Sequence, residues 1–274
     1  MPFARVRDID IYYEIHGERA TSPGGRVLSI SGTGGDLRHN PTRGTGPLEQ
    51  QFEVLMYDQR GLGQTSKPDV PYTMADYADD AAALLEVVGW DQCHVVGVSF
   101  GGMVAQNLVV RHPERVLRLV LACTSPGGAG GSSVDLRTLE GLTPDERARR
   151  SMELLDARVD MSTDPPTMPD GFAELMQMVA GAYGSTPADE ASAMGARRQL
   201  DARAGHDVWD ALASVAAPTL VIGGRDDLLA PAANHERMAG RIPDAQLVLC
   251  EGGHLFMLQD PTAWPTMVGF LSAN

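Results

Sequence analysis

Short runs of apolar residues, each bounded by glycine, proline or polar residues, recur along the first 125 positions. Residues 3–7 and 9–15 alternate apolar and polar side chains and meet at Asp8, which predicts a hairpin at one edge of a sheet. Four further runs are apolar at successive positions, as expected for strands that are buried on both faces: 26–31, 53–58, 94–98 and 116–123.

A helical period appears between two of these runs. Apolar side chains recur three and four positions apart over residues 74–88, which predicts an amphipathic helix. Thr73 and Asp76 form a candidate capping box at its start, and Gly89 ends it. Strands that alternate with helices predict a parallel sheet covered on both faces.

The pattern changes after residue 125. Residues 125–131 are rich in glycine and predict a flexible link. Only helical stretches follow as far as Val215: 148–158, 171–184, 187–203 and 207–215. Strands are again predicted at 218–224 and 245–250, and helices at 234–240 and 261–271.

These elements predict an α/β fold with a mostly parallel, eight-stranded sheet covered by helices. Residues 1–125 and 216–274 are expected to form its core. The all-helical insertion between two late strands, residues 126–215, is expected to be a cap over the strand ends, where open α/β sheets bind ligands.

The segment Gly97-Val98-Ser99-Phe100-Gly101 joins the strand at 94–98 to a helical stretch. This sequence between a strand and a helix is typical of a nucleophile elbow, in which a tight turn strains the central residue and requires small neighbours. The serine hydroxyl then lies above the first helical turn, where the helix dipole favours negative charge. A glycine-rich turn without chemistry is the alternative, but the flanking strand and helix favour Ser99 as a nucleophile.

A serine hydroxyl needs a histidine as base, and that histidine needs a carboxylate to orient it. His254 follows the apolar run at 245–250, and Asp226 and Asp227 follow the run at 218–224. The chain order Ser, Asp, His is the order that α/β-hydrolases use. Adjacent side chains diverge, so only one of the two aspartates can face His254.

Gly32-Thr33-Gly34-Gly35 follows the apolar run at 26–31. Because glycines carry no side chain, backbone N–H groups of such a loop can approach a substrate carbonyl oxygen, as in an oxyanion hole. A simple turn is the other interpretation.

Several segments resemble the signature segments of the α/β-hydrolase superfamily and occur in the same order. They are Asp58-Gln-Arg-Gly-Leu-Gly-Gln-Thr-Ser, Gly97-Val-Ser-Phe-Gly-Gly, His112-Pro-Glu-Arg-Val, Gly224-Arg-Asp-Asp and Gly252-Gly-His. The resemblance covers essentially the whole chain. Within the superfamily, the chain is similar to the branch of 3-oxoadipate enol-lactonases, cofactor-free haloperoxidases and carboxylesterases.

This resemblance implies a catalytic triad of Ser99, Asp227 and His254, since the family spacing counted from Gly224 selects the second aspartate. It also implies an oxyanion hole, to which we assign the following backbone N–H donors: Thr33 and Phe100.

Two departures from the family pattern affect the oxyanion loop and the acyl side of the site. Ser31-Gly32 stands where the family usually has His-Gly. The tryptophan common further along is absent, and Arg38, His39 and Asn40 lie nearby instead.

The expected activity is hydrolysis of a carboxylic ester or lactone of a small, largely apolar substrate through an acyl-enzyme. A hydrolase of carbon–carbon bonds in diketone-type substrates shares the same triad. A ligand-binding hydrolase homologue without catalysis is a further alternative. Epoxide and haloalkane hydrolysis are disfavoured, because those family members carry Asp where this chain has Ser99.

Charge and composition narrow the set of partners. A formal charge of −14 argues against nucleic acid and anionic membranes, which both need a positive protein surface. No run approaches the roughly 20 apolar residues of a membrane span, and the first residues do not resemble a signal peptide. We therefore expect a cytoplasmic protein with a small-molecule partner, and a homo-oligomer is compatible with the sequence.

No motif for a metal or an organic cofactor is present, and the three cysteines are too scattered for a disulfide framework or a zinc site. Other residues are candidates for binding or packing. Arg197, Arg198 and Arg203 could hold a carboxylate under the cap, or could belong to a polar helix face. Four cap methionines are expected to serve packing: Met152, Met176, Met178 and Met194.

Overall fold

The structure is a computed structural model that describes residues 3–21, 23–40, 44–183 and 188–273. Residues 41–43, which precede the predicted strand at 53–58, lie outside this range. So do residues 184–187, where two of the predicted cap helices were expected to end and begin.

Eight strands form one sheet in the order β1-β2-β4-β3-β5-β6-β7-β8. The predicted hairpin is present as β1 (Phe3–Val6) and β2 (Ile9–His16), and β2 also pairs antiparallel with β4 (Glu53–Tyr57). All other pairings are parallel. The remaining strands are β3 (Arg26–Ile30), β5 (Cys93–Val98), β6 (Val116–Ala122), β7 (Thr219–Gly224) and β8 (Gln246–Cys250).

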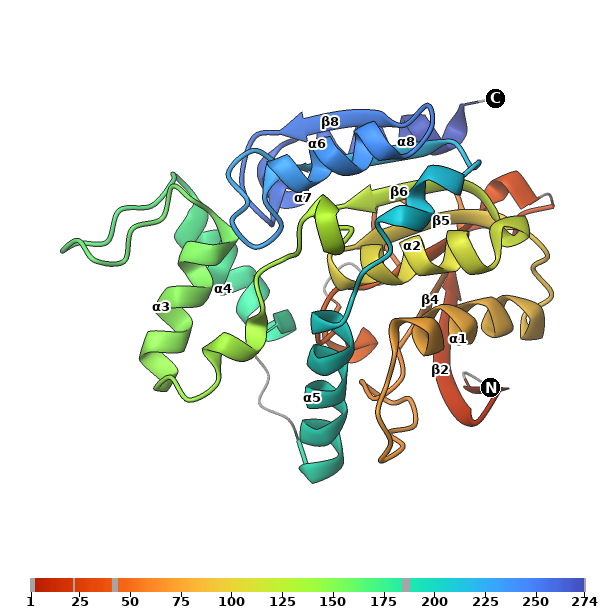
Figure 1. Ribbon diagram of the computed structural model, residues 1–274, viewed down its shortest axis with the longest axis horizontal. Helices are drawn as coiled ribbons and strands as arrows, with labels where there is room; N and C mark the ends of the chain where they lie inside the picture. The colour runs from red at the N-terminus through yellow and green to blue at the C-terminus, as the bar shows by residue number, and fades with distance from the viewer. Residues whose placement is uncertain (1–2, 22, 41–43, 184–187, 274) are drawn as a thin grey trace.

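Helices cover both faces of this sheet (Figure 1). One hydrophobic cluster joins the sheet to α1 (Met74–Val87), α2 (Phe100–Arg111) and α6 (Ala232–Arg241). A second cluster joins the other face to α7 (Phe256–Gln259) and α8 (Ala263–Ser272). The expected fold class is therefore confirmed.

The start of α1 follows its sequence signal. The Thr73 hydroxyl accepts a hydrogen bond from the backbone N–H of Asp76, and the Asp76 carboxylate accepts one from the backbone N–H of Thr73. This reciprocal pair satisfies N–H groups that have no partner inside the helix.

The described residues between β6 and β7 form three α-helices: α3 (Pro144–Leu155), α4 (Phe172–Tyr183) and α5 (Glu190–Ala204). Figure 1 shows α3 and α4 on the side toward which the arrows of β6 and β8 point, so these two helices lie beyond the carboxyl ends of these strands. The division of the chain into a core and a separate cap stays a prediction.

Two expectations about this insertion are wrong. The stretch predicted as a helix over 207–215 forms only a 3-10 helix, Asp210–Ser214. The glycine-rich link is closely packed and contains a 3-10 helix, Gly128–Gly130. A Cβ atom on Gly127 would lie 2.1 Å from the carbonyl oxygen of His206, so glycine is present here because the backbone of another segment passes close by.

The described part of the chain has no helix that is both long and apolar enough to cross a membrane.

Candidate active site

Ser99 lies between β5 and α2 with φ +55° and ψ −115°, a backbone conformation that residues other than glycine rarely adopt. Two glycines make the turn possible. A Cβ atom on Gly97 would lie 2.4 Å from the Gly101 carbonyl oxygen, and one on Gly101 would lie 2.1 Å from that of Ile30. The backbone therefore has the strained, tightly packed turn that the motif predicts.

The three side chains of the predicted triad lie in a line of hydrogen bonds. The Ser99 Oγ lies 3.0 Å from Nε2 of His254, and Nδ1 of the same ring lies 2.7 Å from Oδ2 of Asp227. Because an ionised carboxylate only accepts hydrogen bonds, it favours the tautomer with the proton on Nδ1. Nε2 is then free to accept a hydrogen bond from the serine hydroxyl.

Asp227 is buried, and its second oxygen is also engaged. Oδ1 accepts hydrogen bonds of 2.8 Å from the backbone N–H groups of Leu229 and Ala230. These bonds fix the carboxylate plane with respect to the imidazole. The neighbouring Asp226 points away, is partly exposed, and lies 3.2 Å from Nε of Arg158.

The predicted oxyanion loop packs against the serine. A Cβ atom on Gly32 would lie 3.4 Å from the Cβ of Ser99, which is van der Waals contact distance and places this loop directly beside the serine. Within the described residues, the backbone N–H groups of Thr33 and Phe100 donate no hydrogen bond to the protein. The N–H of Phe100 belongs to the first turn of α2, whose N–H groups have no acceptor inside the helix.

Two glutamines hold this loop, and neither stands out in the sequence as a candidate site residue. The buried Gln59 donates from Nε2 to the carbonyl oxygen of Ser31 at 2.8 Å. Gln199 on α5 accepts a 2.9 Å hydrogen bond from the N–H of Gly34. The position of Gln59 inside a segment that resembles the family signature is the one feature of the sequence that could have indicated its role. Gln199 lies on a helix, and its partner Gly34 is more than 160 positions away in the sequence.

The end of α3 contacts the loop that carries the histidine. The N–H of His254 donates to the carbonyl oxygen of Leu155 at 2.6 Å, and the N–H of Ala157 donates to that of Asp226 at 2.8 Å. The insertion therefore touches the backbone of both loops that carry the predicted base and its orienting acid.

Asp156 reinforces this contact from a fully buried position. Its carboxylate accepts from Gln259 at 2.9 Å and from Arg158 at 2.7 Å, and Gln259 accepts in turn from the N–H of Gly253. Burial opposes ionisation of this carboxyl, but the hydrogen bonds from Arg158 and Gln259 bring the pKa of Asp156 below its ordinary value.

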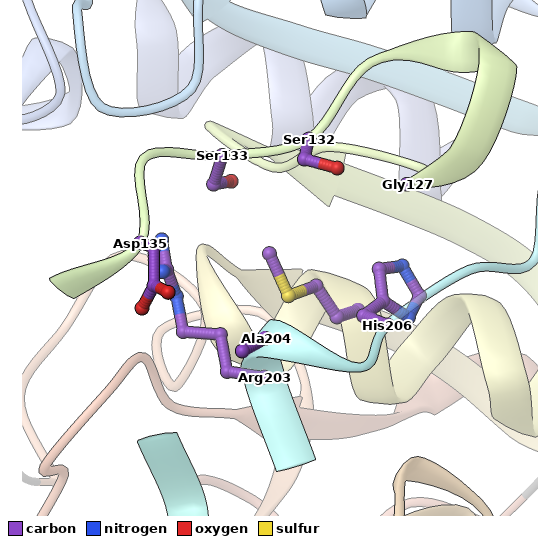
Figure 2. Close-up of a pocket in the computed structure, with 8 residues that line it drawn as sticks. Gly127, Ser132, Ser133, Asp135, Arg203, Ala204 and His206 are labelled. Atoms are coloured by element: carbon purple, nitrogen blue, oxygen red, sulfur yellow. The ribbon is translucent and has the colours of Figure 1, made fainter. Parts of the chain in front are cut away.

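A cavity of about 90 Å³ lies between α2, α5 and the segment after β6 (Figure 2). Its lining consists of Met103, Gly127, Ser132, Ser133, Asp135, Arg203, Ala204 and His206. His206 is neutral in this setting, because burial lowers its pKa to about 4. The cavity is therefore polar, with a buried guanidinium as its cation.

The other candidate residues lie elsewhere. Arg38 and His39 are exposed, and Arg38 pairs with Asp36 at 2.6 Å. Arg197 and Arg198 pair with Glu140 and Asp69 at the surface.

Two of the four cap methionines pack as expected. Met152 and Met176 pack against a small cluster inside the insertion, formed by Val159, Phe172 and Leu175. The side chain of Met178 lies outside what the structure describes. Among the described residues, no cluster of His, Cys, Asp or Glu could hold a metal ion, and the three cysteines are free and buried.

The sequence profile of the alpha/beta hydrolase fold family matches residues 27–261, which is most of the chain. The chain belongs to this family. A protein of Variovorax paradoxus, provisionally named carbamate hydrolase RutD, is 31% identical over 253 residues, which is 89% of each chain. A poly(3-hydroxyalkanoate) depolymerase of Ectopseudomonas oleovorans is 32% identical over 211 residues, 77% of this chain and 71% of that protein.

Among solved structures, the enol-lactonase from Burkholderia xenovorans LB400 superposes with a TM-score of 0.79. The alignment covers 99% of this chain and all of that one at 23% identity, so this likeness concerns the fold.

Proposed function

We propose that this protein is a serine hydrolase that cleaves a carboxylic ester or lactone of a small molecule through an acyl-enzyme. The observation that carries the proposal is the hydrogen-bonded line from Ser99 through His254 to Asp227, with spacings of 3.0 and 2.7 Å. The name of the Ectopseudomonas depolymerase, a relative at 32% identity, also supports an ester as the scissile group.

In the proposed mechanism, Ser99 attacks the carbonyl carbon of the substrate while Nε2 of His254 takes the hydroxyl proton. Asp227 stabilises the imidazolium and keeps its orientation. The backbone N–H groups of Thr33 and Phe100 stabilise the oxyanion. His254 then returns the proton to the leaving alkoxide, and water releases the acid in a second cycle of the same steps.

Carbon–carbon bond hydrolysis is the second candidate, and the buried guanidinium of Arg203 favours it. Such an enzyme must hold an acidic substrate while it protonates a dienol, and this task needs a cationic group near the triad. Arg203 is buried and lines a cavity together with Met103 of α2, the helix that begins after Ser99, whereas Arg38 and His39 are exposed. We keep the ester or lactone as first choice, because it requires no chemistry beyond the triad and an oxyanion hole.

A substrate panel tests the proposal. The kcat/KM values of p-nitrophenyl esters of graded chain length, simple lactones and a dienol-diketone acid are compared for the wild type and Ser99→Ala. We expect ester or lactone turnover that the substitution abolishes, and labelling of the wild type alone by a fluorophosphonate probe. A kcat/KM at least about a hundredfold higher for the diketone acid would assign carbon–carbon cleavage instead.

A further inference from the structure

Arg203 is an arginine buried without an anionic partner. Its side chain leaves α5 and is 5% exposed, and no carboxylate of the described residues lies within ion-pair distance. One nitrogen, Nη1, donates to the carbonyl oxygen of Val134 at 2.5 Å. Charged side chains are seldom buried without a partner, because removing a charge from water is costly.

The two nitrogens that remain form one edge of the guanidinium. Nε and Nη2 of Arg203 are buried and have no hydrogen-bond acceptor among the described residues. This edge matches the two oxygens of a carboxylate. Elsewhere in this protein the same edge binds carboxylates, as Arg60 does with Asp80 and Arg111 with Asp79.

The carboxylate that lines the cavity, that of Asp135, already binds another arginine. Asp135 accepts hydrogen bonds from Nε and Nη2 of Arg137 at 3.0 and 2.8 Å. Burial lowers the pKa of Arg203 to about 10, so its guanidinium is still charged at neutral pH. The cavity therefore keeps a positive charge that no described side chain neutralises directly.

Two residues that line the cavity each lie one helical turn from a residue of the candidate site or of its oxyanion loop. Met103, which lines it, lies one helical turn after Ser99, and its N–H donates to the Ser99 carbonyl oxygen. Arg203 lies one turn after Gln199, which binds the oxyanion loop. One turn of this kind spans about 6 Å along a helix, which is the length of a few carbon–carbon bonds.

Figure 2 shows the Arg203 side chain reaching from α5 toward Asp135, with Ser132 and Ser133 on the opposite wall. A volume of about 90 Å³ can hold a group as small as a carboxylate, and the serines add polar groups beside it.

We propose that Arg203 and this cavity form a subsite that binds a carboxylate on the substrate through Nε and Nη2 of the guanidinium. The inference rests on the proposed hydrolase function and defines its substrate class as esters or lactones with an anionic group a few bonds from the scissile carbonyl. It replaces the expectation of a largely apolar substrate at that end of the molecule.

Paired substrates test the subsite. Mono-p-nitrophenyl glutarate carries the anion on the acyl part, and 4-carboxyphenyl butyrate carries it on the leaving group. Each is compared with its neutral methyl ester in the wild type, in Arg203→Met and in Arg203→Lys. Arg197→Met is the matched control, because it removes the same charge from the exposed face of the same helix.

We expect the wild type to prefer one of the anionic esters by at least about tenfold in kcat/KM, the effect of one charge-assisted pair. Arg203→Met should abolish this preference, Arg203→Lys should keep only part of it, and Arg197→Met should leave it unchanged. The absence of a preference in the wild type, or its persistence in Arg203→Met, would overturn the proposal.

A binding measurement separates this inference from the proposed function. Calorimetry with glutarate, at constant ionic strength, needs neither turnover nor a stable Arg203→Met protein. Glutarate should bind the wild type and bind Arg203→Lys more weakly. Glutarate binding without any ester or lactone turnover would reject the hydrolase function and keep the anion subsite, whereas turnover of neutral esters without glutarate binding would reject the subsite alone.

Discussion

Backbone strain is concentrated beside the candidate nucleophile. Of the four described residues other than glycine with positive φ, Ser99 and Cys123 follow neighbouring strands, β5 and β6, and the N–H of Ser99 donates to the carbonyl oxygen of Ala122. Such conformations cost about 1–3 kcal/mol each and persist only where the surrounding structure enforces them. Here the enforcement is visible in the close contacts at Gly97 and Gly101.

Two substitutions of Ser99 distinguish the cost of backbone strain from the loss of the nucleophile. Both Ser99→Ala and Ser99→Gly should lose hydrolytic activity by several orders of magnitude, because neither can form an acyl-enzyme. Only glycine relieves the strain, so Ser99→Gly should be more stable than Ser99→Ala by about 1 kcal/mol, after allowing for its larger unfolded-state entropy. Urea unfolding measures this difference, and an alanine variant at least as stable as the glycine variant would refute the account of strain.

The two adjacent aspartates give a second prediction for single residues. Asp227→Asn replaces an acceptor that faces Nδ1 of His254 and should lower kcat by about a thousandfold or more, because an amide favours the wrong tautomer of the ring. Asp226→Asn only weakens the surface pair with Arg158 and should stay within about tenfold of the wild type. Comparable losses for both variants would contradict the orientation that the hydrogen bonds indicate.

At the scale of elements, the end of α3 is joined to the loop that carries His254. Leu155 is the last residue of α3, and its carbonyl oxygen accepts a hydrogen bond from the N–H of His254 beside Gly253. A Cβ atom on Gly253 would lie 2.0 Å from the Leu155 carbonyl oxygen, so the two segments meet without room for a side chain. We infer that the end of α3 helps to position the predicted base.

Asp156 allows this positioning to be measured. Asp156→Asn keeps the size of the side chain but weakens the hydrogen bonds from Arg158 and Gln259 that hold the segment. We expect kcat to fall by about tenfold with little change in KM, because the loss affects the reacting geometry and not substrate binding. Asp160→Asn is the control, since Asp160 is exposed in the same insertion. An equal loss of kcat in both variants, or a change confined to KM, would argue against a positioning role.

Local patterns predicted the elements that are defined by local interactions. The capping box at Thr73, the strained serine and all eight strands follow from neighbouring residues. The prediction of a helix over 207–215 was wrong because apolar spacing alone does not distinguish an α-helix from a short 3-10 helix. The prediction of a flexible link at 125–131 was wrong because its glycines are in close contact with distant segments, such as the backbone at His206. Local sequence patterns do not show contacts of this kind.

In the candidate site too, local patterns predicted the residues at strand ends but not the contacts between distant segments. Ser99, Asp227 and His254 each follow an apolar strand, so their meeting follows from sheet topology and chain order. Gln199 and the role of Arg203 depend on which face of α5 packs against the core, and α5 is distant in sequence from its partners. The sequence could name Arg203 as a candidate but could not say that it is buried.

At the scale of the whole molecule, two buried histidines link stability to pH. Burial lowers the pKa of His206 and of His235 to about 4 each, against an ordinary value of 6.5. His235 is fully buried, and neither of its ring nitrogens has a hydrogen-bond partner among the described residues. The unfolded chain thus takes up these protons at a higher pH than the folded protein does.

The sign of the effect follows from this difference. The free energy of unfolding is therefore highest, as far as these histidines are concerned, above about pH 6.5, where the imidazoles are neutral in both states. It falls as the pH falls toward 4, because the unfolded chain is protonated first. The shift corresponds to about 3 kcal/mol for His235 at the lower limit. Carboxylates with lowered pKa, such as Asp8 at about 2, lose their stabilisation only at lower pH, below their ordinary value of 3.8.

Unfolding by urea at a series of pH values between 7 and 4 therefore tests the burial of His235. The free energy of unfolding of the wild type should fall across this range, whereas His235→Leu, which cannot be protonated, should lose less by roughly 3 kcal/mol. His39→Gln removes an exposed histidine and should keep the wild-type slope. The buried Asp58 and Asp80, whose pKa values are raised mainly by burial, oppose the fall, but they are common to all three proteins and cancel in the comparison. Parallel curves for the wild type and His235→Leu would mean that this histidine is protonated in the folded protein, and the account of its burial would then be wrong.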